Sequence, residues 1–181
     1  MSELAAHPAA SVSLDTATSA AQIAERLVAG LTRRRLTIAV AESLTGGLLV
    51  AELVAVPGAS AVVHGGVVAY ATPLKHTVLG VSASLLAEFG PVHPQVATQM
   101  ATGVRDALAV DGTAAYIGVA TTGVAGPGPQ DGIAAGTVFV GIAIGEHVSV
   151  LSLALDGPRE TIRKRVVYES LLELERLLTS R

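Results

Sequence analysis

Short hydrophobic runs alternate along the chain with stretches in which hydrophobic residues recur every three or four positions. The short runs are rich in β-branched residues and end at glycine, proline or polar residues, which is typical of buried strands. The longer periodic stretches are typical of helices that bury one face against a sheet. The pattern predicts five strands, at residues 36–41, 62–70, 113–121, 137–144 and 148–155.

Helix-start and helix-stop signals divide the remaining segments. Ser19 and Gln22 have the spacing of a capping box, which predicts the start of the first helix. Thr72 as a cap, followed by Pro73 at the first helical position, predicts a short helix that carries Lys75. The other predicted helices run from Gly46-Gly47 to about residue 56, from about 95 to 109, and from Pro158 to about 178.

The order of these elements predicts an α/β fold. Helices alternate with strands over the first two-thirds of the chain, and the last two strands are joined tightly at Gly145-Glu146, as in an antiparallel hairpin. We therefore expect a three-layer α/β/α sandwich with a mixed, mostly parallel sheet of about five strands. Residues 1–17 are rich in alanine, serine and threonine without periodicity, which predicts a flexible tail before a single domain at 18–181.

The composition argues against a nucleic-acid partner. Half of the 181 residues are hydrophobic, 15% are charged, and the formal net charge is −3 at pH 7. A nucleic-acid-binding protein would carry a basic stripe with interleaved aromatic residues, and the chain has no such stripe. The arginines at 33–35 fall where the first helix should end, a position at which cations interact favourably with the helix dipole.

The sequence also predicts a cytoplasmic location. The hydrophobic stretch from 36 to 70 is interrupted by Glu42, Glu52, Pro57 and several glycines, so we expect no membrane span. The N-terminus lacks a basic segment followed by a long apolar one, so we expect no signal peptide. The chain has no cysteine, which excludes disulfides and is compatible with a reducing compartment.

Ser43 is the first candidate for chemistry. It directly follows a predicted buried strand and precedes a helix that opens after Gly46-Gly47. A serine on such a turn can project its oxygen above the sheet edge, and the unpaired N–H groups at the helix start can stabilise an oxyanion. From its position alone, a helix cap is the more common role for such a serine, and the spacing does not establish a nucleophile.

A nucleophilic serine requires a base. No histidine of the chain has a recognisable Ser-His-Asp context, although a triad formed in space remains open: His7, His64, His76, His93 and His147. Lys75 is the other candidate, because it is predicted in the first turn of a helix, where the dipole disfavours a charged amine. A solvated surface lysine is the plain alternative.

Two further features suggest an anion site. The segment 123–136 is rich in glycine and proline and follows a predicted strand, and backbone N–H groups in such loops can cradle phosphate. Arg159 stands at the start of the last predicted helix, where a cation opposes the dipole, so binding of an anion explains it better than helix stability does. No histidines or carboxylates show metal-ligand spacing, so we expect neither a metal nor a redox cofactor.

Several motifs resemble one protein family. The segment Ala41-Glu42-Ser43-Leu44-Thr45-Gly46-Gly47 resembles the A-E-S-x-T-G-G signature of the CinA C-terminal family. Further similar blocks follow in the family's order, and together they cover about residues 20 to 178: the blocks at 57–60, 65–70, 79–81 with Lys75, 122–127 and 136–138.

The resemblance implies a hydrolase that deamidates nicotinamide mononucleotide in the recycling of pyridine nucleotides toward NAD. Ser43 would attack the carboxamide carbon, Lys75 would accept its proton, and Tyr70 would hydrogen-bond near this pair. The family tendency also implies a homodimer or higher homo-oligomer that needs no cofactor. The resemblance further implies a set of substrate-binding residues: Thr45, Gly46, Ser60, Thr122, Gly123 and Arg159.

A second function stays open beside this one. The family's name derives from competence and DNA damage induction, so the alternative is a non-catalytic module that binds a nucleotide or a protein partner. The joint presence of Ser43, Tyr70 and Lys75 favours the enzyme, because a binding module has no need of a nucleophile and a base. The chain also departs from the usual family pattern, since His93-Pro94 stands where Ser-Glu is common.

Overall fold

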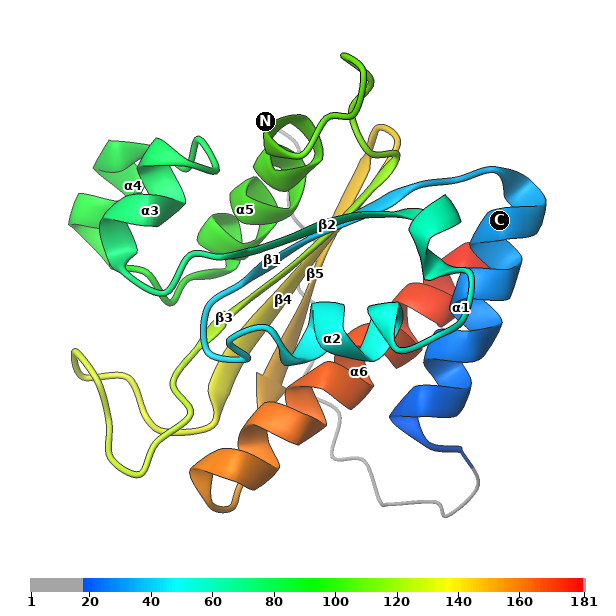
Figure 1. Cartoon of the computed structure of the whole chain (residues 1–181). Coiled ribbons are helices and arrows are strands. Elements are labelled where there is room, and N and C mark those ends of the chain that lie inside the picture. Colours follow the sequence, from blue (N-terminus) through cyan, green and yellow to red (C-terminus); the bar gives the residue numbers. More distant parts are fainter. Residues whose placement is uncertain (1–17, 181) are drawn as a thin grey trace.

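The computed structural model describes residues 18–180, in which a five-stranded sheet carries helices on both faces (Figure 1). The predicted tail at 1–17 lies outside the described residues. The strands are β1 (Ile38–Glu42), β2 (Val63–Val68), β3 (Ile117–Gly123), β4 (Thr137–Ile144) and β5 (His147–Ala154). The helices are α1 (Ala20–Arg34), α2 (Leu48–Val54), α3 (Thr72–Thr77), α4 (Ala83–Phe89), α5 (Pro94–Ala107) and α6 (Arg159–Thr179), with a 3₁₀ turn η1 (Ala59–Ala61).

The sheet is mixed, as predicted, and its strand order is β2-β1-β3-β4-β5. Strand β1 pairs in parallel with β2 and β3, whereas β4 pairs antiparallel with β3 and β5. Four strands therefore run in one direction, and only β4 of this sheet runs against them. Because β2 and β3 lie on opposite sides of β1, the carboxyl end of β1 is a point where the chain connections diverge, which is where open α/β sheets bind ligands.

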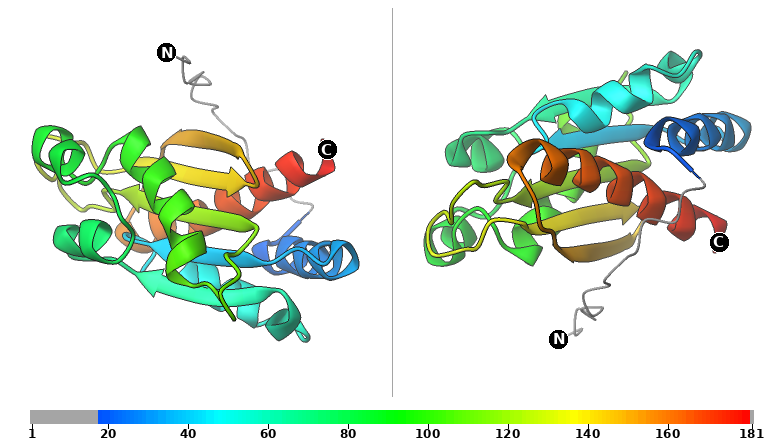
Figure 2. Two further views of the ribbon diagram at one scale, coloured as in Figure 1. Left: turned by 90° about the horizontal axis from the view of Figure 1, so that it is seen from above. Right: turned by 90° about the horizontal axis from the view of Figure 1, so that it is seen from below.

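Helices α1, α2 and α6 cover one face of the sheet, and α5 covers the other, with α3 and α4 beside it (Figure 2). The predicted three-layer α/β/α arrangement is confirmed. The central strands β1, β3 and β4 are largely buried on both faces. In β1 the side chains alternate in size: Ile38 and Val40 face the three-helix layer, while Ala39 and Ala41 face α5. The small residues allow α5 to approach the sheet closely.

Gly118 on β3 lies at the closest point of this contact. A Cβ atom added there would come 1.8 Å from the carbonyl oxygen of Ala101 on α5. We expect Gly118→Ala to lower the free energy of unfolding by about 1–3 kcal/mol or more, because the helix must move away from the sheet. Gly128→Ala is the matched control, since nothing lies within 4 Å of a Cβ at that position. Urea unfolding of both variants checks the prediction, and equal midpoints would contradict it.

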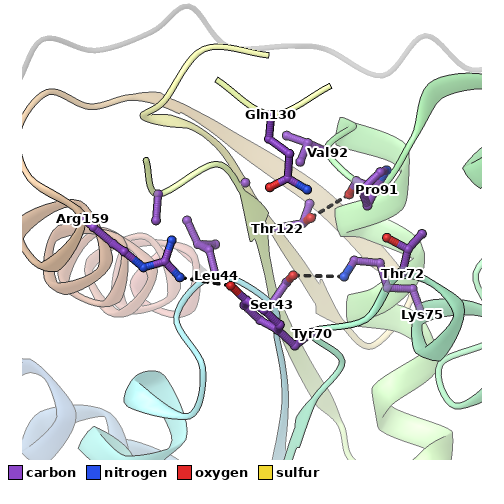
Figure 3. Close-up of a pocket in the computed structure, with 12 residues that line it drawn as sticks. Ser43, Leu44, Tyr70, Thr72, Lys75, Pro91, Val92, Thr122, Gln130 and Arg159 are labelled. Carbon is purple, nitrogen blue, oxygen red and sulfur yellow. Dashed lines mark hydrogen bonds between the residues drawn. The ribbon is translucent and has the colours of Figure 1, made fainter. Parts of the chain in front are cut away.

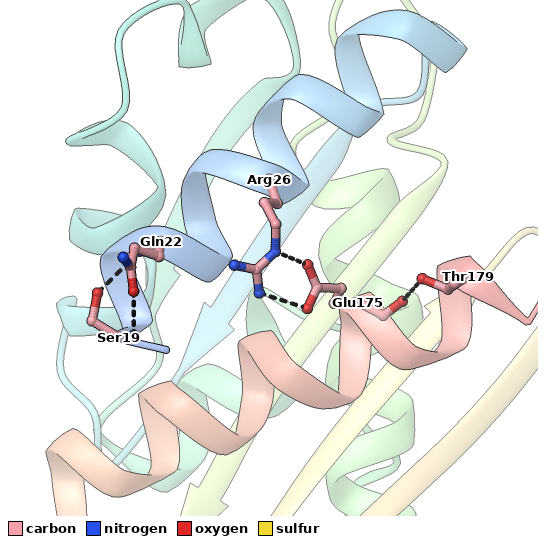
Figure 4. A network of polar contacts seen from close by, with 5 residues as sticks. All are labelled: Ser19, Gln22, Arg26, Glu175 and Thr179. Atoms are coloured by element: carbon pink, nitrogen blue, oxygen red, sulfur yellow. Dashed lines mark hydrogen bonds and ion pairs between the residues drawn. The ribbon is translucent and has the colours of Figure 1, made fainter. Parts of the chain in front are cut away.

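The first helix begins at the predicted capping box. The Ser19 hydroxyl accepts a hydrogen bond from the Gln22 N–H at 3.2 Å, and the Gln22 side chain accepts one from the Ser19 N–H at 2.9 Å (Figure 4). One turn later, Arg26 donates two hydrogen bonds to Glu175 of α6, at 2.7 and 2.9 Å. This pair is largely exposed, so it contributes little to stability, although it joins the two helices of one layer.

Several element boundaries differ from the sequence prediction. Strand β3 starts four residues later than predicted, because Thr113 pairs with Val110 across a tight turn with positive φ at Asp111 and Gly112. Helix α3 starts at Thr72 itself, so Thr72 is its first helical residue rather than its cap. Helix α4 was not predicted, because its seven residues are too few to show a helical period.

The departure at His93-Pro94 has a local structural explanation. The His93 side chain accepts a hydrogen bond from the Gln95 N–H and so caps α5, while Pro94 occupies the first helical position. Proline is favoured there because its fixed φ suits the first turn. Among the helices between residues 18 and 180, none is both long and apolar enough to cross a membrane.

Candidate active site

The turn that follows β1 is organised by Glu42. Its carboxylate is fully buried and accepts hydrogen bonds from three backbone N–H groups at the start of α2: Gly47 at 3.0 Å, Leu49 at 3.1 Å and Val50 at 2.8 Å. Glu42 therefore caps α2, and the side chain of Ser43 does not. The prediction that the first N–H groups of this helix bind an oxyanion was wrong, because the Glu42 carboxylate already occupies them.

Ser43 contacts Lys75 instead. The Lys75 Nζ lies 3.0 Å from the Ser43 Oγ and donates a second hydrogen bond to the carbonyl oxygen of Ala69 at 2.7 Å. The backbone N–H of Ser43 is bound to the carbonyl oxygen of Thr121 at 3.0 Å, which fixes the turn against β3. The serine and the lysine are 32 residues apart in the chain, and the fold brings them into direct contact.

Lys75 is buried and forms no ion pair within residues 18–180. Its side chain is 1% exposed, and this burial lowers the pKa of its amine from the ordinary value of 10.5 to about 8. Lys75 lies in the last turn of the six-residue helix α3, where the dipole favours a charged amine. The lowered pKa therefore comes from desolvation, and the sequence-based argument from the helix dipole was wrong.

No histidine in the described part of the chain hydrogen-bonds Ser43. His64 and His76 each bind a backbone carbonyl oxygen. His93 caps α5, and His147 is exposed on β5. His7 lies outside the described residues. Lys75 is therefore the basic side chain that the described structure places against Ser43.

Ser43 and Lys75 lie in a pocket at the carboxyl ends of β1, β2 and β3 (Figure 3). Most of the residues singled out from the sequence line it: Ser43, Tyr70, Lys75, Thr122, Gly123 and Arg159. Thr45 and Gly46 lie in the turn behind Ser43, where the Thr45 hydroxyl is buried and hydrogen-bonded to that of Thr121 at 2.7 Å. This bond joins the turn to the end of β3.

Ser60 lies away from this pocket. It is exposed in η1, directly before β2 begins, whereas Ser43 lies beyond the other end of the sheet, where β2 finishes. Since β1 and β2 are parallel, their starts and their carboxyl ends fall at opposite ends of the sheet. Ser60 therefore lies outside this pocket, contrary to the prediction that it binds the substrate there.

The Tyr70 hydroxyl hydrogen-bonds Arg159, and within the described residues it makes no hydrogen bond to Ser43 or Lys75. The Arg159 guanidinium donates to the Tyr70 hydroxyl at 3.1 Å (Figure 3). It also donates to the carbonyl oxygen of Gly126 at 3.1 Å. Tyr70 is 61% exposed. The two side chains therefore stand at the mouth of the pocket, where the guanidinium is held between a phenol and the glycine-rich loop.

Sequence reasoning missed part of the lining. The additional residues are Leu44, Thr72, Pro91, Val92, Ala125 and Gln130. Pro91 contributes through its carbonyl oxygen, which accepts a hydrogen bond from the Thr122 hydroxyl at 2.6 Å and so ties the segment between α4 and α5 to β3. Gln130 belongs to the glycine- and proline-rich loop, whose composition was the signal that could have identified it.

Fold and site together define an α/β protein with a serine–lysine pair at the carboxyl ends of its parallel strands. Residues 20–178 match the family described as the CinA C-terminal domain, and the chain belongs to this family. The resemblance seen in the sequence motifs is therefore confirmed.

Named relatives and solved structures agree with this assignment. The chain is 46% identical over 155 residues to a CinA-like protein of Frankia casuarinae, covering 85% of this chain and 35% of the relative. The chain therefore spans about a third of the length of that relative. The crystal structure of a CinA superfamily protein from Escherichia coli matches with a TM-score of 0.84 at 30% identity, covering 92% of this chain and 94% of that one. A competence/damage inducible protein from Agrobacterium tumefaciens matches with a TM-score of 0.81 at 33% identity, covering 92% and 99%.

Proposed function

We propose that this chain is an amidohydrolase that converts nicotinamide mononucleotide into nicotinate mononucleotide and ammonia. The observation that carries the proposal is the contact between a buried lysine amine of lowered pKa and a serine hydroxyl, 3.0 Å apart in a pocket. A desolvated lysine without a carboxylate partner is unfavourable for folding, and the need for a base in contact with a nucleophile explains it.

The reaction has two stages. Ser43 Oγ attacks the carboxamide carbon while its proton passes to the neutral amine of Lys75, and Lys75 then protonates the leaving nitrogen as the C–N bond breaks. In the second stage, a water molecule attacks the resulting ester and gives its proton to Lys75, which returns a proton to Ser43 Oγ. The lysine is neutral at the start of each stage, which a pKa of about 8 permits.

The tetrahedral intermediate requires donors for its negatively charged oxygen. Within the described chain, the N–H groups of Leu44, Thr45 and Gly46 make no hydrogen bond. They belong to three successive residues directly after the nucleophile, and successive free N–H groups form anion-binding concavities. Of these three residues Leu44 lines the pocket, whereas Thr45 is fully buried behind Ser43. We therefore assign the Leu44 N–H as the oxyanion donor, in place of the start of α2.

Arg159 supplies the charge for the phosphate of the substrate. It lies at the first position of α6, so the N–H groups and the dipole of the helix start add to its positive charge. Its bonds to the Tyr70 hydroxyl and the Gly126 carbonyl leave the guanidinium without a carboxylate partner in the described residues. An anionic group at the pocket mouth can therefore bind it.

Arg159→Ala is expected to raise KM for nicotinamide mononucleotide roughly 10- to 100-fold with little change in kcat, because a hydrogen bond to a charged group contributes about 1.5–3 kcal/mol. The measurement is steady-state ammonia release. Nicotinamide riboside serves as the control substrate, because it lacks the phosphate and should be hydrolysed equally by both proteins. A matching loss with the riboside would contradict the phosphate role.

The proposed function is tested by ammonia release from the purified protein with nicotinamide mononucleotide, the riboside and nicotinamide, each with and without a metal chelator. We expect release with the mononucleotide, and no dependence on metal. The alternative, a non-catalytic binding module, predicts saturable binding of the mononucleotide without release of ammonia. Absence of turnover under all these conditions would refute the enzyme proposal.

A further inference from the structure

Arg163 reaches from α6 to the turn that carries the nucleophile. Its Nε donates to the carbonyl oxygen of Leu44 at 2.9 Å, and its Nη2 donates to that of Thr45 at 2.7 Å. The side chain is half-buried and forms no ion pair within residues 18–180. The planar guanidinium therefore directs its donors at two consecutive peptide groups, a two-point contact that a single ammonium cannot make in the same way.

The two bonds determine the direction of two N–H groups. In a trans peptide, the carbonyl of one residue and the N–H of the next point in opposite directions across a rigid plane. With the carbonyls of Leu44 and Thr45 held toward Arg163, the N–H groups of Thr45 and Gly46 point away from it. The two peptide planes directly after the Leu44 Cα are thereby fixed, which limits the directions that the N–H of Leu44 can take at the pocket.

The turn fits this contact closely. Gly46 has a φ of +61°, and a Cβ atom at this position would lie 3.2 Å from Arg163 Nη2. A side chain at 46 would therefore strain the turn and crowd the guanidinium. The ends of the turn have other anchors, since Glu42 binds the N–H groups of α2 and the Thr45 hydroxyl binds Thr121. Arg163 binds both intervening carbonyls, and that of Thr45 also accepts a longer hydrogen bond from the Leu48 N–H at 3.4 Å.

We infer that Arg163 is a positioning residue that fixes the turn directly after Ser43, and with it the Leu44 N–H that would bind the oxyanion, a role that rests on the proposed function. Arg163 acts through the backbone and does not line the pocket. Its loss leaves the Ser43–Lys75 pair and Arg159 in place. The effect therefore falls on the transition state rather than on substrate binding.

The test compares Arg163→Ala and Arg163→Lys with Arg165→Ala, a control on the same helix whose side chain pairs with Glu169 instead. For Arg163→Ala we expect kcat for ammonia release to fall roughly 10- to 100-fold, with KM nearly unchanged, because a misdirected oxyanion donor stabilises the transition state poorly. Arg163→Lys should recover part of the rate, since an ammonium can donate to one of the carbonyls. The pH midpoint of the reaction should stay at its wild-type value, because Lys75 is untouched.

A second readout separates this inference from the choice of substrate. Acylation of Ser43 by p-nitrophenyl acetate, followed by mass spectrometry and nitrophenolate release, also passes through an oxyanion but needs no pyridine nucleotide. If the wild type is acylated yet releases no ammonia, the proposed substrate is wrong, and a slower acylation of Arg163→Ala still supports the role of Arg163. Equal acylation rates in folded Arg163→Ala and wild type, an equal loss in Arg165→Ala, or no acylation of wild-type Ser43 would overturn it.

Discussion

Replacing Ser43 with alanine is expected to lower kcat for ammonia release by roughly 10⁴- to 10⁶-fold, because the acyl intermediate can no longer form. The fold should be unaffected, since the Ser43 side chain contacts Lys75 while Glu42, not Ser43, caps α2. Ammonia release measures the loss, and urea unfolding shows whether the variant is intact.

The chain provides a matched control for this substitution. Ser60→Ala removes an exposed hydroxyl in η1, outside the pocket, and should leave both kcat and KM at wild-type values. A folded Ser43→Ala protein that retains more than a few per cent of the wild-type rate would exclude Ser43 as the nucleophile. In that case a water molecule activated by Lys75 would be the next mechanism to test.

Lys75→Arg is expected to be nearly as damaging as Ser43→Ala. A guanidinium stays protonated near neutral pH, so it cannot accept the proton of the serine hydroxyl. Because the two residues act as a unit, the double variant should be little worse than either single one. Lys164→Arg, an exposed position paired with Glu160, is the control and should have wild-type activity. Near-normal turnover by folded Lys75→Arg would show that Lys75 is not the base.

The pH profile offers a second test of the same residue. The neutral amine is the active form, so kcat/KM should rise with pH and level off above a midpoint near the pKa of about 8. Below the midpoint, the rate should fall tenfold per pH unit as the amine takes up its proton. A midpoint at the ordinary value for lysine, 10.5, would indicate that the base is solvated, which contradicts the burial of Lys75.

The strands and the nucleophile could be predicted from sequence because their signals are local. Each strand is a hydrophobic run bounded by glycine or polar residues, and Ser43 directly follows one of them within a recognisable motif. The predicted sheet therefore agrees with the structure except at boundaries such as the start of β3. The short helix α4 had no comparable signal, since seven residues complete scarcely two turns.

The supporting residues of the site depend on contacts that are distant in sequence. Arg163 binds Leu44 and Thr45 across more than a hundred residues, and no local pattern distinguishes it from the other charged residues of α6. Glu42 caps α2 only because the chain turns back on itself after β1, and this turn is not evident from the sequence around Glu42. Burial of Lys75 is likewise a tertiary property, because α3 is too short to reveal which of its faces points inward.

The buried amine of Lys75 also links folding to the uptake of a proton. Its pKa is about 8 in the folded chain and near 10.5 when the chain is unfolded, so between these values the unfolded state binds more protons. Stability contributed by this group therefore increases as pH rises from about 8 to 10.5. Below pH 8 both states carry the proton, and the folded state bears the full penalty of a buried charge, on the order of 3 kcal/mol. Lys75 therefore lowers the free energy of unfolding most below pH 8, whereas catalysis requires its amine to be neutral.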